Sequence, residues 1–210
     1  IQKFMRKNIA ILFVLIVLFT NNYTHAINGY ILLKTGEKID VEIRISSTYM
    51  GTNFEALTKG IKYYDKDGGR KYLELEFVKE LYFKIDTNDY KMVCFKNTMK
   101  VRDENFIVKP YIMLYEVQKG TLSNYSINRP IKIENDDPLR FLYQTNLSGR
   151  FVNVLQIEGK QPIKVSNLKF RKPLLKYIAT CKEVTSKIEK GEYGKYDLTK
   201  IVNEYNEVCK

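Results

Sequence analysis

Catalytic and metal-binding chemistry depends on a few versatile residue types, and this chain is poor in them. Its 210 residues contain one histidine, His25, three cysteines and no tryptophan. A lone histidine invites a catalytic or metal-binding interpretation. Here that interpretation depends on whether the histidine belongs to the working protein, because it lies close to a typical processing site.

The N-terminal segment has the three parts of a secretory signal peptide. A short cationic head precedes an unbroken apolar run of 11 residues, 9–19, and Thr24 and Ala26 occupy the −3 and −1 positions of a cleavage site. The apolar run is shorter than the ~20 residues that span a bilayer. The sequence therefore predicts a signal peptide over residues 1–26, export to the periplasm or the extracellular space, and no transmembrane anchor in the mature chain.

Cleavage after Ala26 would discard His25 and leave a mature chain of 184 residues without histidine. Such a chain has no Ser-His-Asp or Cys-His nucleophile system. It also has no His-ligated zinc and no two-histidine iron site. The residue directly after the cleavage point is Ile27 and not a cysteine, so a lipid-anchored lipoprotein is not indicated either. We expect no catalytic residue, no metal and no cofactor.

One group of carboxylates has a spacing that suggests calcium. Asp65 and Asp67 open a segment in which Glu76 stands at the twelfth position, as in an EF-hand loop. The intervening residues do not supply the other ligands, and Asp-Gly-Gly between two strands is common hairpin chemistry. The hairpin is therefore the preferred interpretation.

A second group of carboxylates precedes Pro138 and consists of Glu134, Asp136 and Asp137. Two carboxylates can hydrolyse a glycosidic bond, one as acid and one as base or nucleophile. Neighbouring acids in a polar segment before proline are more typical of a solvated turn. A carboxylate enzyme that acts on envelope glycans remains the alternative to a non-catalytic protein.

The densest basic stretch consists of Lys164, Lys169, Arg171, Lys172 and Lys176. It reaches the start of a predicted helix, where the helix dipole also favours anions. The pattern indicates contact with phosphate, an acidic glycan or a membrane surface; the alternative is a solvated linker. The mature chain has 32 basic against 24 acidic residues, a formal net charge of +8. Because export disfavours nucleic acid, we expect an envelope protein or an anionic surface polymer as partner.

The cysteines are Cys94, Cys181 and Cys209, and export would bring them into an oxidising compartment. We expect Cys181 to pair with Cys209, because two antiparallel helices would bring them together, and Cys94 to stay reduced and buried in a strand. If one helix runs from Pro173 to about residue 190, Cys181 and Cys209 would differ by roughly 6 Å in height along the axes of the two helices. The alternative is that Cys181 is a small core residue and Cys209 a free thiol.

The sequence to about residue 162 predicts short strands and turns. Apolar and polar residues alternate from Tyr30 to Ile45 around the turn 35–38, and a second hairpin surrounds Asp67. Later runs rich in Tyr, Phe, Ile and Val are separated by Gly, Asn and Asp. We expect an antiparallel β domain over residues 27–162, curled as a barrel or folded as a sandwich. Most of the fifteen tyrosines of the mature chain are then half-buried sheet residues, although tyrosines on a sheet face also bind sugars or proteins.

Residues 163–210 predict a basic linker followed by a helical hairpin. Pro173 suits the start of a helix, and a helical stripe follows that includes Leu174, Ile178, Cys181 and Ile188. Asp197 is a suitable N-cap for a second helix. The fold class is therefore α+β, with strands and helices segregated along the chain.

Three segments together resemble a family of uncharacterised exported bacterial proteins. They are YILLKTGEKIDVEI, IKYYDKDGGRKYLELEFVKELYF and FRKPLLKYIATCKEVTSKIEKGEYGKYDLTKIVNEYNEVC. Members of that family carry a signal peptide, a β domain that begins with a Leu-Lys-x-Gly-Asp hairpin, and two C-terminal helices with a mid-helix cysteine and a Tyr-Asn pair near the end, often followed by another cysteine. The matching residues are Cys181, Tyr205, Asn206 and Cys209, while Glu37 stands where the family more often has Asp. The resemblance implies export and no particular activity.

These observations favour an exported envelope protein that acts as a binding or structural module without catalysis. Two alternatives remain open. One is the carboxylate enzyme that acts on glycans, and the other is a factor that clamps an acidic partner through the basic stretch. An enzyme needs two acids that converge in a pocket, whereas a module needs an exposed aromatic or basic face.

Overall fold

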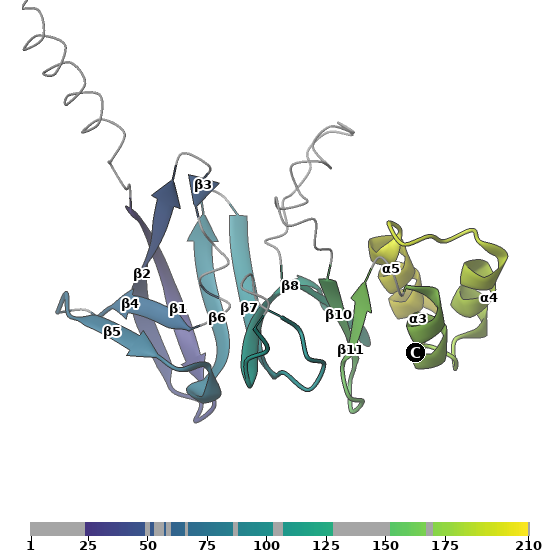
Figure 1. Cartoon of the computed structure of the whole chain (residues 1–210), viewed down its shortest axis with the longest axis horizontal. Helices are drawn as coiled ribbons and strands as arrows, with labels where there is room; N and C mark the ends of the chain where they lie inside the picture. The colour runs from purple at the N-terminus through teal and green to yellow at the C-terminus, as the bar shows by residue number, and fades with distance from the viewer. Residues whose placement is uncertain are drawn as a thin grey trace, which may run out of the picture.

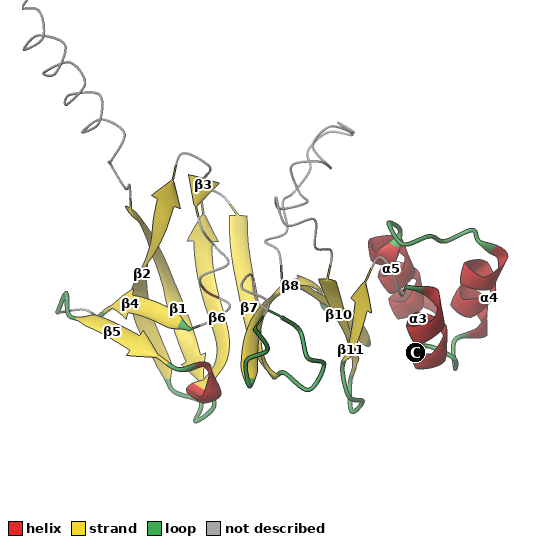
Figure 2. Cartoon of the chain, viewed as in Figure 1, coloured by secondary structure: helices red, strands yellow, loops and turns green. Residues whose placement is uncertain are grey.

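The structure is a computed structural model of the chain. It describes residues 24–48, 51–52, 57, 60–65, 67–85, 88–102, 107–127, 152–166 and 170–209. Strands dominate the first part of the chain and helices the last (Figures 1 and 2), so the predicted α+β class is confirmed.

In the residues that the structure describes, eleven strands form one antiparallel sheet with the order β11-β10-β9-β8-β7-β6-β1-β2-β4-β5, and β3 pairs with β2 off this path. Their bounds are β1 Thr24–Leu33, β2 Lys38–Thr48, β3 Gly51–Thr52, β4 Ile61–Tyr64, β5 Arg70–Leu73, β6 Val78–Ile85, β7 Asn88–Lys96, β8 Tyr111–Gln118, β9 Leu122–Ser126, β10 Val152–Ile157 and β11 Ile163–Ser166. In the described part of the chain the sheet does not close, because β5 and β11 form its two edges. Of the two predicted shapes, the barrel is therefore not formed.

The two predicted hairpins are present. The β1–β2 turn contains Gly36 at a φ of 91°, a left-handed conformation that glycine adopts without steric cost. In the β4–β5 turn, Asp65 accepts backbone hydrogen bonds from Asp67 and Gly69 through its carboxylate. Hydrophobic periodicity and turn residues were thus sufficient to predict both turns.

The first core lies on one face of the sheet. Ile31 of β1, Ile43 of β2, Leu81 of β6 and Ile61 of β4 are all fully buried in it. Because Ile61 joins this cluster, the β4–β5 hairpin folds over the face of the central strands, as Figure 1 shows. The short 3₁₀ helix η2 (Leu75–Phe77) contributes the buried side chain of Leu75 to this core.

Strand β10 shows how the other two cores arise on opposite faces of the sheet. Side chains alternate between the two faces of a strand. Val154 packs with Phe95 and Val101 in one cluster, and the adjacent Leu155 packs with the helices in another. The sheet is thus covered at this end by residues near Val101 on one face and by helices on the other.

Helices follow the sheet, and Figure 2 shows them gathered beyond β11. They are α3 Arg171–Tyr177, α4 Lys182–Lys190 and α5 Leu198–Val208. The prediction of two helices was wrong in this detail, because the first predicted helix is broken at residues 178–181. Its apolar stripe was predicted correctly, since Leu174, Ile178, Cys181 and Ile188 are all buried. Periodicity identifies a buried face but does not distinguish one long helix from two short ones that share it.

Two elements extend beyond the boundaries expected from sequence. β1 begins at Thr24, upstream of the predicted cleavage point, and β11 lies in the segment expected to be a linker. Asp197 stands at the N-cap of α5, as expected, but its carboxylate accepts a hydrogen bond from the N–H of Gly194 instead of capping the helix. In the described part of the chain, no helix is long and apolar enough to cross a membrane.

Candidate functional site

Four of the five predicted anion-binding residues lie on two elements that pack together. Lys164 is on β11, and Arg171, Lys172 and Lys176 are on α3; all four are exposed. β11 and α3 share one core, in which Val165 packs with Leu174. The fifth residue, Lys169, lies outside the described residues. Lys164 pairs with Val154 across the β10–β11 ladder and so lies on the sheet face away from the helices, whereas the other three residues lie on α3. We call Lys164, Arg171, Lys172 and Lys176 together the basic surface.

Like the exposed sheet residues Lys62, Lys84 and Lys96, the four cations of the basic surface lack acidic partners among the described residues. Lys71, Lys91, Lys187 and Lys200 each form an ion pair with a carboxylate. Within the described residues, none of the four cations of the basic surface has such a partner. A lysine on an edge strand also hinders pairing with other chains, so Lys164 alone indicates no site. A site is indicated only together with the cations of α3.

The orientation of α3 is set by its buried side. Leu174 is fully buried between α3 and the sheet. The hydroxyl of Tyr177 accepts a hydrogen bond from the N–H of Ile157 at 3.0 Å and donates one to the carbonyl of Gln161 at 3.0 Å. These two contacts hold α3 against the β10–β11 hairpin. Lys172 and Lys176 are four residues apart and therefore lie on the same outward face.

Arg171 also lies close to the C-terminal end of α4. Its Nη2 atom is near Gly191, the left-handed C-cap of α4, and would be 3.5 Å from a Cβ atom at that position. A guanidinium near the end of a helix interacts favourably with its dipole. Arg171 therefore also contributes to the packing of α3 against α4, whereas Lys164, Lys172 and Lys176 extend into solvent.

Asn206 connects α5 to the sheet. Its side-chain oxygen accepts a hydrogen bond from the N–H of Leu122 at 2.7 Å, and its nitrogen donates one to the carbonyl of Leu122 at 2.9 Å. The amide thus pairs with β9 as a neighbouring strand would. Any side chain on Gly120 would collide with Asn206, so the glycine in this turn makes the close approach possible.

A second contact connects α5 to β8. The side-chain nitrogen of Gln118 donates hydrogen bonds to the carbonyl of Thr199 at 3.2 Å and to the side-chain oxygen of Asn203 at 2.6 Å. The Tyr-Asn pair of the family resemblance therefore has a structural explanation here. Tyr205 is buried in the helical core, and Asn206 pairs with the sheet.

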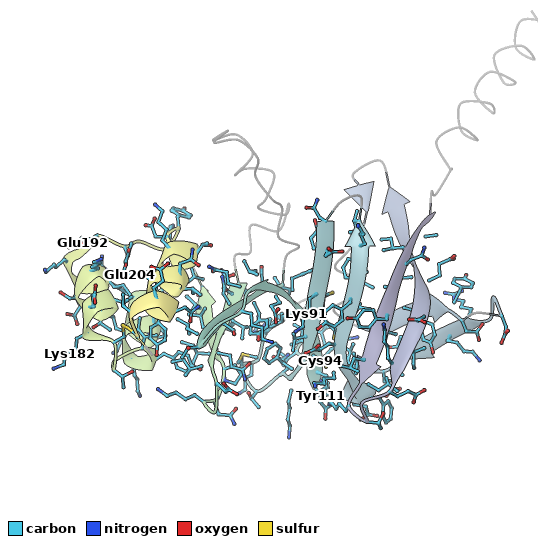
Figure 3. The ribbon with its side chains drawn as sticks, turned by 180° about the vertical axis from the view of Figure 1, so that it is seen from behind. Lys91, Cys94, Tyr111, Lys182, Glu192 and Glu204 are labelled. Atoms are coloured by element: carbon cyan, nitrogen blue, oxygen red, sulfur yellow. A yellow bond between two sulfur atoms is a disulfide. The ribbon has the colours of Figure 1, made fainter. Side chains whose placement is uncertain are left out.

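Glu204 joins α5 to α4 and to the loop between them (Figure 3). Its carboxylate forms an ion pair with Lys187 at 2.6 Å and accepts a hydrogen bond from the hydroxyl of Tyr193. The hydrogen bonds from Lys187 and Tyr193 lower the pKa of Glu204. The acid is therefore engaged within the helical part and unsuited to act as a general acid, which needs a raised pKa.

Cys181 and Cys209 lie at disulfide distance, with Cα atoms 5.6 Å apart, which is a usual separation for a disulfide. The break in the first predicted helix removes the expected difference in height. Cys181 stands at the start of α4 and Cys209 at the end of α5, so the two cysteines meet at one end of an antiparallel pair. The geometry agrees with the predicted pairing.

Cys94 on β7 is the free cysteine among the three. Its thiol donates a hydrogen bond to the carbonyl of Leu75 at 3.1 Å. Burial raises the pKa of the Cys94 thiol to about 11, even though Lys34 lowers it. A thiol with so high a pKa is a poor nucleophile at neutral pH, so Cys94 acts as a packing residue.

Sequence reasoning missed a charged network on the sheet face opposite the first core. Lys91 of β7, which is labelled in Figure 3, lies 3.3 Å from a carboxylate oxygen of Glu80 and 3.3 Å from one of Glu116. The hydroxyl of Tyr82 donates a hydrogen bond to Glu80 at 2.6 Å. The alternation of strands β6 to β8 puts these side chains on one face, and only knowledge of the strand register would have connected them.

The electrostatics of this network indicate a structural role. Burial lowers the pKa of Lys91, but Tyr82 and the two carboxylates raise it by more. Burial raises the pKa of Glu80, but Tyr82 and Lys91 lower it by more, so that the net shift is downward. A catalytic acid requires the opposite shift. Glu80 and Lys91 both remain charged and hold each other in place.

The tyrosines beside this network are also engaged. Tyr30 and Tyr82 stack with ring centroids 4.5 Å apart. Lys38 lies over the Tyr30 ring at 4.0 Å and Lys91 over the Tyr82 ring at 5.4 Å. The ring faces of the pair are thus occupied by each other and by cations, which leaves little room for a sugar to stack on them.

The other predicted chemistries gain no support from the described residues. The carboxylate of Asp65 binds the backbone of its own turn and lies 3.4 Å from Lys71, as expected for a hairpin and not for a calcium loop. Glu134, Asp136 and Asp137 lie outside the described residues. Within the described part of the chain, no three His, Cys, Asp or Glu side chains gather as a metal site would require.

Comparison with known proteins produced no match to a family model, to a curated protein or to a solved structure. The resemblance to exported bacterial proteins therefore stays a prediction from sequence, and functional conclusions depend on the geometry alone.

Proposed function

We propose that this protein is an exported, non-catalytic binding module of the cell envelope, and that its basic surface engages an anionic surface polymer. The sheet acts as the scaffold, and the three helices hold the basic surface at its β11 edge. The partner is recognised by charge, with Lys164, Lys172 and Lys176 as the principal contacts.

One observation carries the proposal. Lys172 and Lys176 lie four residues apart on one exposed face of α3, Lys164 is exposed on the neighbouring strand, and none of the three has an acidic partner among the described residues. Unpaired cations close to one another attract polyanions, because the potential sums over neighbouring charges. Exposed lysines also lose little hydration free energy when they meet a solvated polymer.

The other polar clusters are held by internal partners, which supports a non-catalytic role. The carboxylates of Glu80, Glu116 and Glu204 are each paired with a lysine, and neither Glu80 nor Glu204 has the raised pKa of a general acid. These acids do not favour the carboxylate enzyme. The clamp on an acidic protein uses the same cations and differs only in the partner.

Retention of the mature protein on a heparin column tests the proposal. The triple variant Lys164→Gln, Lys172→Gln, Lys176→Gln is compared with a control that loses the same charge from exposed lysines on the sheet, Lys62→Gln, Lys84→Gln, Lys96→Gln. Arg171 is left in place because of its contact with α4. We expect the wild type and the control to elute at similar salt concentrations. The triple variant should elute at a much lower salt concentration, because it has lost the lysines that contact the heparin and salt screens the remaining charge contacts.

Equal elution of the two triple variants would show that retention follows net charge alone, and the basic surface would lose its assignment. Circular dichroism on both variants confirms that they are folded. A competition arm, in which an acidic protein and a polyanionic glycan displace the column-bound protein, distinguishes the polymer from the clamped acidic protein.

A further inference from the structure

Strand β5 forms one edge of the sheet, and its outer side has no neighbour among the described strands (Figure 1). Along an antiparallel ladder, residue pairs that exchange backbone hydrogen bonds alternate with pairs that do not. The N–H of Asp65 donates to the carbonyl of Gly69 at 3.1 Å, and the β4–β5 ladder continues in register from there. The backbone groups of Lys71 therefore bond to β4, whereas those of Arg70 and Tyr72 point towards the open edge.

The side chains of β5 divide between the two faces of the hairpin. Leu73 packs against the first core on one face. The other face carries Arg70, Tyr72 and Glu74, which follows the strand with an extended backbone, and all three are exposed. The Tyr72 side chain is 58 % exposed, and its ring lies beside Gly60, where any side chain would collide with it. Within the described residues, neither Arg70 nor Glu74 has an ion-pair partner.

We propose that two copies of this chain pair through their β5 edges in antiparallel orientation, with Tyr72 of both copies at the two-fold axis. In this register Arg70 of each copy faces Glu74 of the other, so one surface is complementary to itself. Tyr72 exchanges backbone hydrogen bonds with its counterpart through the groups that point to the open edge. The two tyrosine side chains become cross-strand neighbours, and an opposite-charge pair lies on each side of them.

Other pairings of the described edges lack this complementarity. A parallel, in-register pair of β5 strands would place Arg70 beside Arg70 and Glu74 beside Glu74, and like charges that face each other are destabilising. An antiparallel pair with Arg70 opposite Tyr72 would keep the outward backbone groups in contact but remove both charge pairs. The other edge, β11, contains Lys164 and no carboxylate, so it cannot match itself by charge.

The small size of the edge determines the kind of association. β5 has 4 residues, and an interface of one short strand from each copy belongs to the weak, reversible class. Charged residues on an edge strand usually prevent association with other chains. On β5 the cation and the anion disfavour a partner without the matching pattern and favour a second copy. The pairing does not involve the basic surface, so its test is independent of the proposed function.

Sedimentation equilibrium of the purified protein over a concentration series tests the pairing. Arg70→Glu and Glu74→Arg each convert both opposite-charge pairs into like-charge pairs, and each should weaken dimerisation at least about 10-fold. An equimolar mixture of the two variants regains opposite charges at both positions and should dimerise about as well as the wild type. Lys96→Glu makes the same change in net charge as Arg70→Glu at an exposed position on β7, and it should leave dimerisation unchanged.

The variant Tyr72→Cys gives an independent readout of the register. The Cα atoms of a hydrogen-bonded antiparallel pair are about 5.5 Å apart, which is within the range of a disulfide. Under mild oxidation this variant should form a cross-linked dimer, whereas Lys62→Cys on the adjacent strand should not.

Recovery of dimerisation in the mixture would also show that both single variants are folded. A wild type that stays monomeric over the whole concentration series would overturn the proposal. Dimerisation that persists in both single variants, a mixture that does not recover, or equal cross-linking of Tyr72→Cys and Lys62→Cys would overturn it as well.

Discussion

The two ends of this molecule are stabilised in different ways. The end formed by β1, β2, β4 and β6 to β8 has a core made mainly of aliphatic side chains, with a charged network across the opposite face of β6 to β8. The helical end has elements of only 7, 9 and 11 residues. Isolated helices of this length are marginal in water, so they depend on tertiary contacts.

The contacts that compensate for short helices are specific ones. A cysteine pair joins α4 to α5, Asn206 pairs with β9, and Tyr177 attaches α3 to the β10–β11 hairpin. Such contacts fix a rigid position for α3 and its lysines. The strands thus supply most of the burial, whereas the helical end uses covalent and polar contacts to hold the helices in place.

The largest expected effect comes from the cysteine pair. Reduction, or the variant Cys181→Ser with Cys209→Ser, should cost about 3 kcal/mol of the free energy of unfolding, because a bridge over this length of chain restricts the unfolded state by about that amount. Hydrogen exchange should locate the loss in α4 and α5 and leave β1 and β6 protected. The measurement is denaturant unfolding with and without reductant.

The variant Cys94→Ala is the control for this experiment. Because Cys94 is free, its removal should leave the response to reductant unchanged. Three free thiols in the exported, denatured protein, or a bridge that includes Cys94, would contradict the pairing.

A smaller effect is expected at the junction of the two ends. Asn206→Ala leaves the N–H and the carbonyl of the buried Leu122 without their partner, which should cost about 2 kcal/mol. Asn203→Ala is a matched control, since Asn203 is exposed and Gln118 keeps its bond to the carbonyl of Thr199; we expect about 0.5 kcal/mol. Equal values in chemical denaturation would mean that Asn206 does not anchor α5.

The smallest expected effect concerns the sheet network. The pKa of Glu80 is lowered in the folded protein, so its contribution is complete above the unfolded value of about 4.3 and is lost as the pH falls through the folded value. Glu80→Gln should cost about 1 kcal/mol at pH 7 and progressively less as the pH falls below about 4. Unfolding free energies of both proteins between pH 7 and pH 3 test this; a constant difference over the range would contradict the assignment.

Much of the fold was predictable from the sequence because it follows from local chemistry. Alternation and turn residues indicate the β1–β2 and β4–β5 hairpins, and the helical stripe from Leu174 to Ile188 indicates the buried face. The break at residues 178–181 was not predictable, because the same stripe serves one helix or two. The Lys91 network and the pairing of Asn206 with β9 depend on contacts between segments far apart in the chain, which no local pattern encodes.

The basic surface was predicted from its composition, and the structure adds the reason for its arrangement. Lys172 and Lys176 share one face of α3, and Lys164 lies on the strand that packs beside that helix. The separate role of Arg171 near Gly191 required the fold, because these residues are 20 positions apart in the chain.

Chemical-shift mapping is the most direct test of whether the basic surface binds an anionic polymer. Isotope-labelled mature protein is titrated with a short heparin fragment, and backbone amide shifts are followed along the chain. We expect salt-sensitive changes in the amide chemical shifts of β11 and α3, around Lys164, Lys172 and Lys176. The amide of the ion-paired Lys91 should change little. Shifts spread evenly over the lysines of the sheet, or no shifts at low salt, would contradict it.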